Sequence, residues 1–185
     1  MRKLIVMNRI SLDGFFAGPQ GEIDWFIHDP AVDAAAHEMM SPDTLLLGRL
    51  TYEMFYGYWP QAAADPNAPQ GIRRTAEELR QMNKVVFSGT LPEAAWENTQ
   101  LVRADPAGAV RALKAGDGPD ITIFGSGTIV QQLARAKLVD EYLIILTPVL
   151  LGVGQVLFAN ANLTELELLE ARSFASGNVL LHYAV

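Results

Sequence analysis

Short runs of β-branched and aromatic residues alternate with amphipathic stretches through the first three quarters of the chain. Apolar runs of this kind predict strands, and apolar residues repeated every three or four positions predict helices. Strands are expected at residues 3–10, 43–48, 84–88, 100–103, 121–124, 141–147, 166–173 and 178–184. Helices are expected at residues 30–40, 49–56, 72–82 and 106–116, and another after Gly127. This order predicts an α/β fold of three layers, with a mixed, mostly parallel central sheet between helices and an antiparallel hairpin at the end.

Gly125, Ser126 and Gly127 stand directly between an expected strand and an expected helix. Glycine permits the positive φ and the close backbone approach that such a tight turn needs. The amides of Thr128 and Ile129, at the positive end of the helix dipole, favour an anion such as phosphate. A glycine turn that only redirects the chain fits the same pattern. The sequence therefore leaves a phosphate cradle and a simple turn both open.

Composition limits the classes of protein to which the chain can belong. With 185 residues, of which 50% are apolar and 19% charged, the chain is expected to form a single domain over residues 1–185. It has no cysteine, and His28, His37 and His182 lack metal-binding spacing, so neither a disulfide nor a metal site is expected. The net charge of −7 argues against nucleic acid or an anionic membrane as a partner. No apolar run reaches the ~20 residues of a membrane span and no signal peptide is recognisable, so a cytoplasmic protein is expected.

Four segments, in order along most of the chain, resemble the dihydrofolate reductase-like superfamily, and specifically its RibD C-terminal branch of riboflavin-biosynthesis reductases. The segments are residues 11–15 with 24–26, residues 48–52, residues 86–91, and residues 125–127 with 138–141. Residues 147–158 agree with the same family. The resemblance implies a dihydrofolate reductase-like fold and a reductase that transfers a hydride from NADPH, with NADH as the alternative cofactor. It also implies a homodimer, because relatives are commonly dimers.

The resemblance places the pyrophosphate of the cofactor on residues 125–129. It places the adenosine phosphate near Gly48, Arg49 and Thr51. The guanidinium of Arg49 at a helix start can form charge-assisted hydrogen bonds to phosphate, and the Thr51 hydroxyl can complete the site. Alternatively, Arg49 pairs on the surface with Glu53, an interaction of only ~0.3–0.5 kcal/mol.

Ser88 is expected beside the phosphate of the adenosine ribose. Relatives commonly follow this serine with arginine, whereas Gly89 follows it here. Arg73, Arg74 or Arg103 could supply the cation instead. The resemblance thus favours NADPH and leaves NADH as an alternative.

Two acidic residues are the candidates for catalysis. Asp24 is placed like the carboxylate with which dihydrofolate reductases bind a pterin and assist its protonation, a role that suits a half-buried acid with a raised pKa. An N-cap or loop-surface aspartate fits Asp24 equally well. Residues 11–22 are expected to form a loop long enough to cover a site, and within it Asp13 either contacts the substrate or forms a turn with Gly14. The neighbouring Trp25 could stack on a planar heterocycle or fill the core.

The remaining expected contacts concern the substrate. Helical spacing and the resemblance predict that Tyr56 faces the substrate and that Phe55 lies in the core. Asn8 and Pro148 are expected as substrate-binding residues on the same resemblance. Phe124 stands where riboflavin reductases typically have a glutamate, so the substrate pocket is expected to differ from theirs. Only a class of substrate, a small heterocycle or carbonyl compound, is therefore expected. Reduction of 5-amino-6-(5-phosphoribosylamino)uracil, reduction of dihydrofolate, and nucleotide binding without catalysis are the alternatives.

Overall fold

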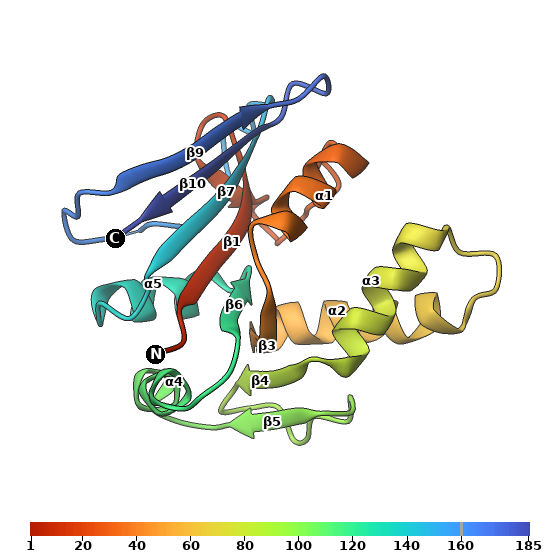
Figure 1. Cartoon of the computed structure of the whole chain (residues 1–185), viewed down its shortest axis with the longest axis vertical. Helices are drawn as coiled ribbons and strands as arrows, with labels where there is room; N and C mark the ends of the chain where they lie inside the picture. The colour runs from red at the N-terminus through yellow and green to blue at the C-terminus, as the bar shows by residue number, and fades with distance from the viewer. Residues whose placement is uncertain (160) are drawn as a thin grey trace.

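Eight strands form the central sheet of the computed structural model, which describes residues 1–159 and 161–185 (Figure 1). Across the sheet the strands are β5 (Thr99–Val102), β4 (Asn83–Phe87), β3 (Pro42–Gly48), β6 (Asp120–Phe124), β1 (Leu4–Ser11), β7 (Glu141–Thr147), β10 (Val179–Ala184) and β9 (Glu167–Ser173). All pairings from β5 to β7 are parallel, while β10 is antiparallel to both β7 and β9. The predicted mixed, mostly parallel sheet with a terminal antiparallel hairpin is confirmed.

Helices cover both faces of this sheet. They are α1 (Pro30–Glu38), α2 (Arg49–Ala64), α3 (Gln70–Gln81), α4 (Pro106–Ala115) and α5 (Gly127–Arg135). Successive strand residues point to opposite faces, so Leu4 and Val6 pack with Val130 of α5, whereas Ile5 packs with Val32 of α1. Apolar residues of α4 join the α5 side, and those of α2 and α3 form a cluster on the α1 side of β3 and β4. The three predicted layers are therefore present.

One strand of a second, two-stranded sheet lies within the segment that was expected to be only a loop. β2 (Phe15–Ala17) pairs antiparallel with β8 (Gln155–Val156). A Cβ atom on Gly154 would lie 2.5 Å from the carbonyl oxygen of Ala17, so glycine is needed for the two backbones to approach. The expectation of a loop over residues 11–22 is thus wrong for residues 15–17, because the pairing partner lies far along the chain.

Helix α2 is longer than the sequence pattern predicts. It continues past Tyr56 to Ala64 and contains Pro60. Proline removes one main-chain hydrogen bond from a helix interior, but Ala62 is buried and the rings of Phe55 and Trp59 are in edge contact. Side-chain packing therefore keeps the helix continuous at the proline. Within the ranges that the structure describes, no helix is both long and apolar enough to cross a membrane.

A buried carboxylate links the start of β1 to β7 and β10. Glu141 accepts a hydrogen bond from Lys3 Nζ at 2.6 Å, and its other oxygen lies 2.8 Å from His182 Nε2. Burial alone raises the pKa of Glu141, but the hydrogen bonds and charges of Lys3 and His182 outweigh burial and hold that pKa below its ordinary value. A lowered carboxyl pKa stabilises the fold above the ordinary value of 4.5, and this stabilisation is lost as the pH falls through the folded-state pKa.

We expect Glu141→Gln to lower the free energy of unfolding by about 1–3 kcal/mol near neutral pH, because it removes the charge that Lys3 and His182 face. The difference should shrink as the pH falls below about 4.5, since the wild-type carboxylate then becomes protonated as well. Urea denaturation in neutral and in acidic buffer would measure both values. A difference that stays the same at both pH values would contradict the assignment.

Candidate functional site

Two helix N-termini meet at one edge of the sheet. Strands β3 and β6 are parallel neighbours, and each is followed directly by a helix, α2 after β3 and α5 after β6. The two helices cover opposite faces of the sheet, so the chain diverges between the carboxyl ends of these strands. Ligands of open α/β sheets bind in the crevice at such a topological switch point. The glycine turn of residues 125–127 lies here.

The hydroxyl of Ser126 joins the two helix starts. Its Oγ accepts a hydrogen bond from the amide of Gly48 at 2.7 Å and lies 2.9 Å from Thr51 Oγ1. Ser126 has a φ of 60°, in the left-handed region that non-glycine residues rarely adopt. The amide of Gly125 also donates to Asn8 Oδ1 on β1, at 3.3 Å. Three parallel strands therefore hold the turn in place, and Asn8 and Ser126 act as its anchors.

The amides at these two helix starts have no side-chain cap. Asp29 and Asp105 cap α1 and α4 with their carboxylates, whereas no side chain caps α2 at Gly48 or α5 at Ser126. Helix α3, which starts after a proline away from this edge, lacks a cap as well. Uncapped amides at a helix start, together with the dipole, favour an anion.

The first turn of α5 determines which of its amides have a hydrogen-bond acceptor. The amide of Ile129 donates to the carbonyl of Ser126 at 2.8 Å, so this expected contact is already used within the turn. Among the described residues, no acceptor takes the amides of Gly127 and Thr128, and Thr128 is exposed. Ile129 instead contributes a buried side chain to the core.

Glycine at two positions of this edge is required by contact distances. A Cβ atom on Gly48 would lie 2.6 Å from Ser126 Oγ, and one on Gly127 would lie 2.7 Å from the ring of Phe16 on β2. Both distances are shorter than non-bonded atoms tolerate. The glycines therefore let α2, α5 and the β2 ribbon converge on one place.

Arg49 makes the surface pair that the sequence left open as an alternative. Its Nη1 lies 2.8 and 3.1 Å from the two carboxylate oxygens of Glu53. The side chains are 41% and 44% exposed, and exposed pairs of this kind contribute about 0.3–0.5 kcal/mol. Because this pair is weak, Arg49 can leave Glu53 and bind a phosphate at the adjoining start of α2.

The segment after β4 forms a compact turn around Ser88. Its Oγ accepts hydrogen bonds from the amides of Thr90 and Leu91, at 3.2 and 2.9 Å. Arg103 donates to the carbonyls of Leu91 and Pro92, at 2.9 and 2.8 Å. Of the cations that could replace the arginine expected after Ser88, Arg103 is the one that this turn holds.

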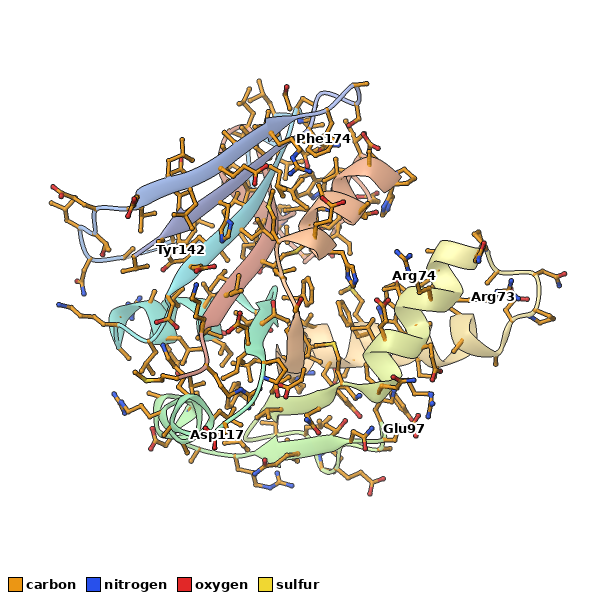
Figure 2. The ribbon with its side chains drawn as sticks, in the orientation of Figure 1. Arg73, Arg74, Glu97, Asp117, Tyr142 and Phe174 are labelled. Carbon is orange, nitrogen blue, oxygen red and sulfur yellow. The ribbon has the colours of Figure 1, made fainter. Side chains whose placement is uncertain are left out.

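Three residues lie away from the starts of α2 and α5, namely Arg73, Arg74 and Tyr56. Figure 2 shows both arginines on α3, where Arg73 donates to a loop carbonyl and Arg74 lies 3.6 Å from a glutamate of the same helix. Tyr56 stacks on Tyr52 with ring centroids 5.7 Å apart and lines, with Trp96, a pocket between α2, α3 and residues 95–97. The structure does not bring these three residues to the glycine turn.

Asp13 fastens the loop after β1 to the segment after β7. Its carboxylate accepts hydrogen bonds from Ser11 Oγ at 2.6 Å, from the amide of Gly152 at 2.7 Å and from the amide of Leu151 at 3.1 Å. The hydrogen bond from Ser11 and those from the two amides lower the pKa of Asp13. Asp13 is therefore a charged acceptor that positions the two loops. Pro148, in the fastened segment, is exposed and packs beside Gly177.

Asp24 is exposed, which corrects the expectation of a half-buried acid. Residues 24–25 form a turn in which Trp25 Nε1 donates to the carbonyl of Glu22 at 3.0 Å. This turn directs Asp24 to solvent, as the loop-surface alternative requires. Trp25 is partly buried and meets Phe26 edge to face, with centroids 4.6 Å apart.

Sequence reasoning missed three buried polar groups at this end of the sheet. Arg9, Thr147 and Asn178 each carry a buried nitrogen or oxygen atom without a hydrogen-bond partner among the described residues. Each is a polar residue at or beside an inward position of a mostly apolar strand. This break in the apolar pattern could have identified them from the sequence. Within the same residues, no group of three or more histidine, cysteine, aspartate or glutamate side chains is arranged to hold a metal ion.

Comparison with known proteins gives consistent matches over nearly the whole chain. The family model described as "RibD C-terminal domain" matches residues 2–180. The uncharacterized protein YyaP of Bacillus subtilis is 30% identical over 188 residues, which cover 98% of this chain and 94% of YyaP. Among solved structures, a protein assigned to riboflavin biosynthesis from Shewanella sp. PV-4 has a TM-score of 0.73 and 23% identity, with 98% of both chains covered. Dihydrofolate reductase from Enterococcus faecalis, complexed with NADP(H), has a TM-score of 0.66 and 15% identity over 98% of this chain and 95% of that one. These structures share the dihydrofolate reductase-like fold with the chain.

Proposed function

The chain belongs to the RibD C-terminal domain family, and we propose that it is an NADPH-dependent reductase that transfers a hydride to a small heterocyclic or carbonyl substrate. One observation carries the proposal. The open starts of α2 and α5 are joined by Ser126 at the switch point of a parallel sheet, which is where a dinucleotide can place its phosphates.

The residues at this edge fit a dinucleotide. The turn at Gly125, with the amides of the buried Gly127 and the exposed Thr128, would hold the pyrophosphate, since both amides lack an acceptor among the described residues. The Arg49 guanidinium, only weakly engaged by Glu53, would hold the adenosine phosphate beside Gly48, whose own amide already donates to Ser126 Oγ. Thr51 would keep the two sites aligned through its contact with Ser126, and the turn around Ser88 would line the ribose end. When bound, the nicotinamide supplies the hydride, and the protein supplies position and exclusion of water.

On the substrate side we propose separate roles for the two acids. Asp13 is a positioning residue, because its lowered pKa and three donors keep it charged. Asp24 is the proton donor, which requires the turn at Trp25 to fold over the substrate so that the indole stacks on it. Asn8 and Pro148 would border the substrate from β1 and from the fastened segment.

The end of β6 presents an apolar wall to the substrate. Phe124 and Phe55 are in contact, with ring centroids 6.2 Å apart. An aromatic wall suits a planar, weakly polar ring. This wall supports a substrate other than the phosphoribosylated aminouracil of riboflavin synthesis.

Calorimetric titration with NADPH tests the cofactor, and a nicotinamide-oxidation screen over pterins, pyrimidines, quinones and small carbonyls tests the reaction. We expect saturable binding at one nucleotide per chain and oxidation with at least one substrate class. Absence of heat and of tryptophan quenching with both NADPH and NADH would overturn the proposal.

Arg49→Ala is expected to weaken NADPH binding by about tenfold, or ~1.4 kcal/mol, because it removes a charge-assisted contact to the adenosine phosphate. NADH lacks that phosphate, so its affinity should change by less than about twofold. Glu53→Ala is the matched control, since it frees Arg49 and should leave NADPH binding unchanged or tighter. Equal losses for both nucleotides would show that Arg49 does not contact the phosphate.

We also propose that residues 1–185 act as one cytoplasmic domain that forms a homodimer. The edge strand β9 exposes Leu168 and Leu169, and an unpaired apolar edge favours association with a second copy. The net charge of −7 disfavours nucleic acid or an anionic membrane as the partner. Analytical ultracentrifugation that finds only monomer at all concentrations would refute the dimer.

A further inference from the structure

Three buried polar atoms share one face of the sheet. They are Arg9 Nη1 on β1, Thr147 Oγ1 on β7 and Asn178 Oδ1 beside β10, and none has a hydrogen-bond partner among the described residues. Thr147 and Asn178 are 0% exposed, and the side chain of Arg9 is 9% exposed. Buried polar atoms are nearly always paired. Three unpaired atoms together therefore need a reason.

Strand register brings these residues together. Ser11 pairs with Thr147, and Leu146 pairs with Val179, so Asn178 follows opposite Thr147. Arg9 precedes Ser11 by two residues and therefore points to the same face. Ile5 and Ile145 show that this is the face that α1 covers.

One segment contacts two of the three residues. The side-chain Nδ2 of Asn178 donates to the carbonyl of Ile27 at 3.1 Å, and the guanidinium of Arg9 lies 5.8 Å from the centre of the Phe26 ring. Arg9 Nη2 also lies 2.5 Å from Asp33 Oδ1 at the start of α1. Residues 24–28, which precede the Asp29 cap of α1, are thus held over Arg9 and Asn178 by one hydrogen bond and one cation–π contact. The same residues carry Asp24 and Trp25 of the proposed active site.

The charge of Arg9 is already balanced. Asp33 contacts it directly. Asp29 is close enough that, after hydrogen bonds from Ser176 and from backbone amides, the charge of Arg9 helps to lower the pKa of the Asp29 carboxyl. Two carboxylates thus already face one guanidinium, and a further anion would add to the negative charge of this site. A neutral group is the better partner.

We propose that Arg9, Thr147 and Asn178 form a subsite for a neutral carboxamide-type group of the substrate, reached when residues 24–28 lift. The carbonyl oxygen of such a group would accept from Arg9 Nη1 and the Thr147 hydroxyl, and its N–H would donate to Asn178 Oδ1. The identification of this ligand as the substrate rests on the proposed reductase. The subsite itself lies on β1, β7 and β10, beside the strands that would hold the nucleotide.

Benzamide and benzoate are matched probes, because they differ only in whether the polar end is neutral or charged. Calorimetry on the full chain without nucleotide should show benzamide binding at least about tenfold tighter than benzoate. Thr147→Val should weaken benzamide by about tenfold, whereas Thr147→Ser keeps the hydroxyl and should stay within about twofold. Thr164→Val, at an exposed position, is the control for the substitution itself.

Thermal unfolding gives a second readout. Thr147→Val should raise the melting temperature, because it replaces an unpaired buried hydroxyl with an apolar group of the same shape. A lowered melting temperature, equal binding of benzamide and benzoate, no loss in Thr147→Val, or a crystal structure with an internal water only would each overturn the proposal. Since neither assay uses NADPH, benzamide binding without any nicotinamide oxidation would refute the reductase and retain the subsite.

Discussion

Replacing Gly48 by alanine is expected to weaken NADPH binding by about thirtyfold, or ~2 kcal/mol, while the chain stays folded. Gly48 has a φ of −83° and a ψ of 168°, a backbone conformation that alanine adopts freely. The loss comes instead from the added methyl group, which would lie 2.6 Å from Ser126 Oγ and 3.0 Å from Ser126 Cβ. The starts of α2 and α5 must then separate, and the two sets of amides no longer face one dinucleotide. Calorimetric titration of NADPH would measure the change.

A double substitution separates the contact from other causes. Ser126→Gly removes the atoms that the new methyl group meets, and glycine adopts a φ of 60° more readily than serine. In the Ser126→Gly background, which has already lost the hydroxyl, Gly48→Ala should therefore weaken NADPH binding much less than it does in the wild type. If Gly48→Ala acted by disrupting β3, its cost would be the same in both backgrounds. Equal losses would contradict the contact mechanism.

Lys84→Ala is expected to lower the free energy of unfolding by about 2–4 kcal/mol. Lys84 is 1% exposed, and its Nζ donates to the carbonyls of Leu79, Arg80 and Met82 at 2.8, 3.2 and 2.8 Å. These bonds close the C-terminus of α3, where a cation also meets the helix dipole favourably. The ammonium lies 4.6 Å from the centre of the Trp96 ring. Alanine would leave the carbonyls unpaired and a cavity beside the indole.

Urea denaturation would measure this loss, and two variants define its source. Lys84→Met keeps most of the volume, so its loss reports the hydrogen bonds and the charge alone. Arg111→Ala, on the exposed face of α4, should change stability by less than about 0.5 kcal/mol. If Lys84→Ala changed stability no more than Arg111→Ala, the role assigned to the buried ammonium would be wrong.

The same lysine predicts a dependence on alkaline pH. Burial lowers the pKa of Lys84 from 10.5 to about 8. Between these values the unfolded chain binds more protons than the folded chain, so the contribution of Lys84 makes the wild type more stable as the pH rises through this interval. Lys84→Met should lack this rise.

The sequence predicted most strands because each is a run of apolar residues bounded by turns. The prediction for β7 matches its observed bounds, that for β10 differs by one residue at its start, and that for β4 is shifted by one residue at both ends. The pairing of β2 with β8 was missed because Phe15 and Val156 lie far apart in the chain and each strand is very short. The length of α2 was missed because a local rule about Pro60 was overridden by packing.

The candidate site was only partly predictable for a similar reason. The glycine turn could be recognised because Gly125 and Gly127 are local signals. The surface pair of Arg49 could be anticipated as an alternative to phosphate binding because Glu53 follows four residues later. The exposure of Asp24 depends on how residues 22–25 fold on themselves. The hydrogen bond from the Gly152 amide to Asp13 joins two segments that no local sequence pattern relates. Tertiary contacts, more than residue type, decide which side chains meet.

The Ser126 hydroxyl has a consequence for ligand selection. Because it is hydrogen-bonded to both Gly48 and Thr51, it holds the starts of α2 and α5, where we propose that phosphates bind, at one fixed separation. A ligand whose two phosphate groups match that separation engages both ends, and the second contact forms at high effective concentration. A mononucleotide can engage only one end. In the proposed site the serine would thus select ligands by the distance between their phosphates, without contacting a base.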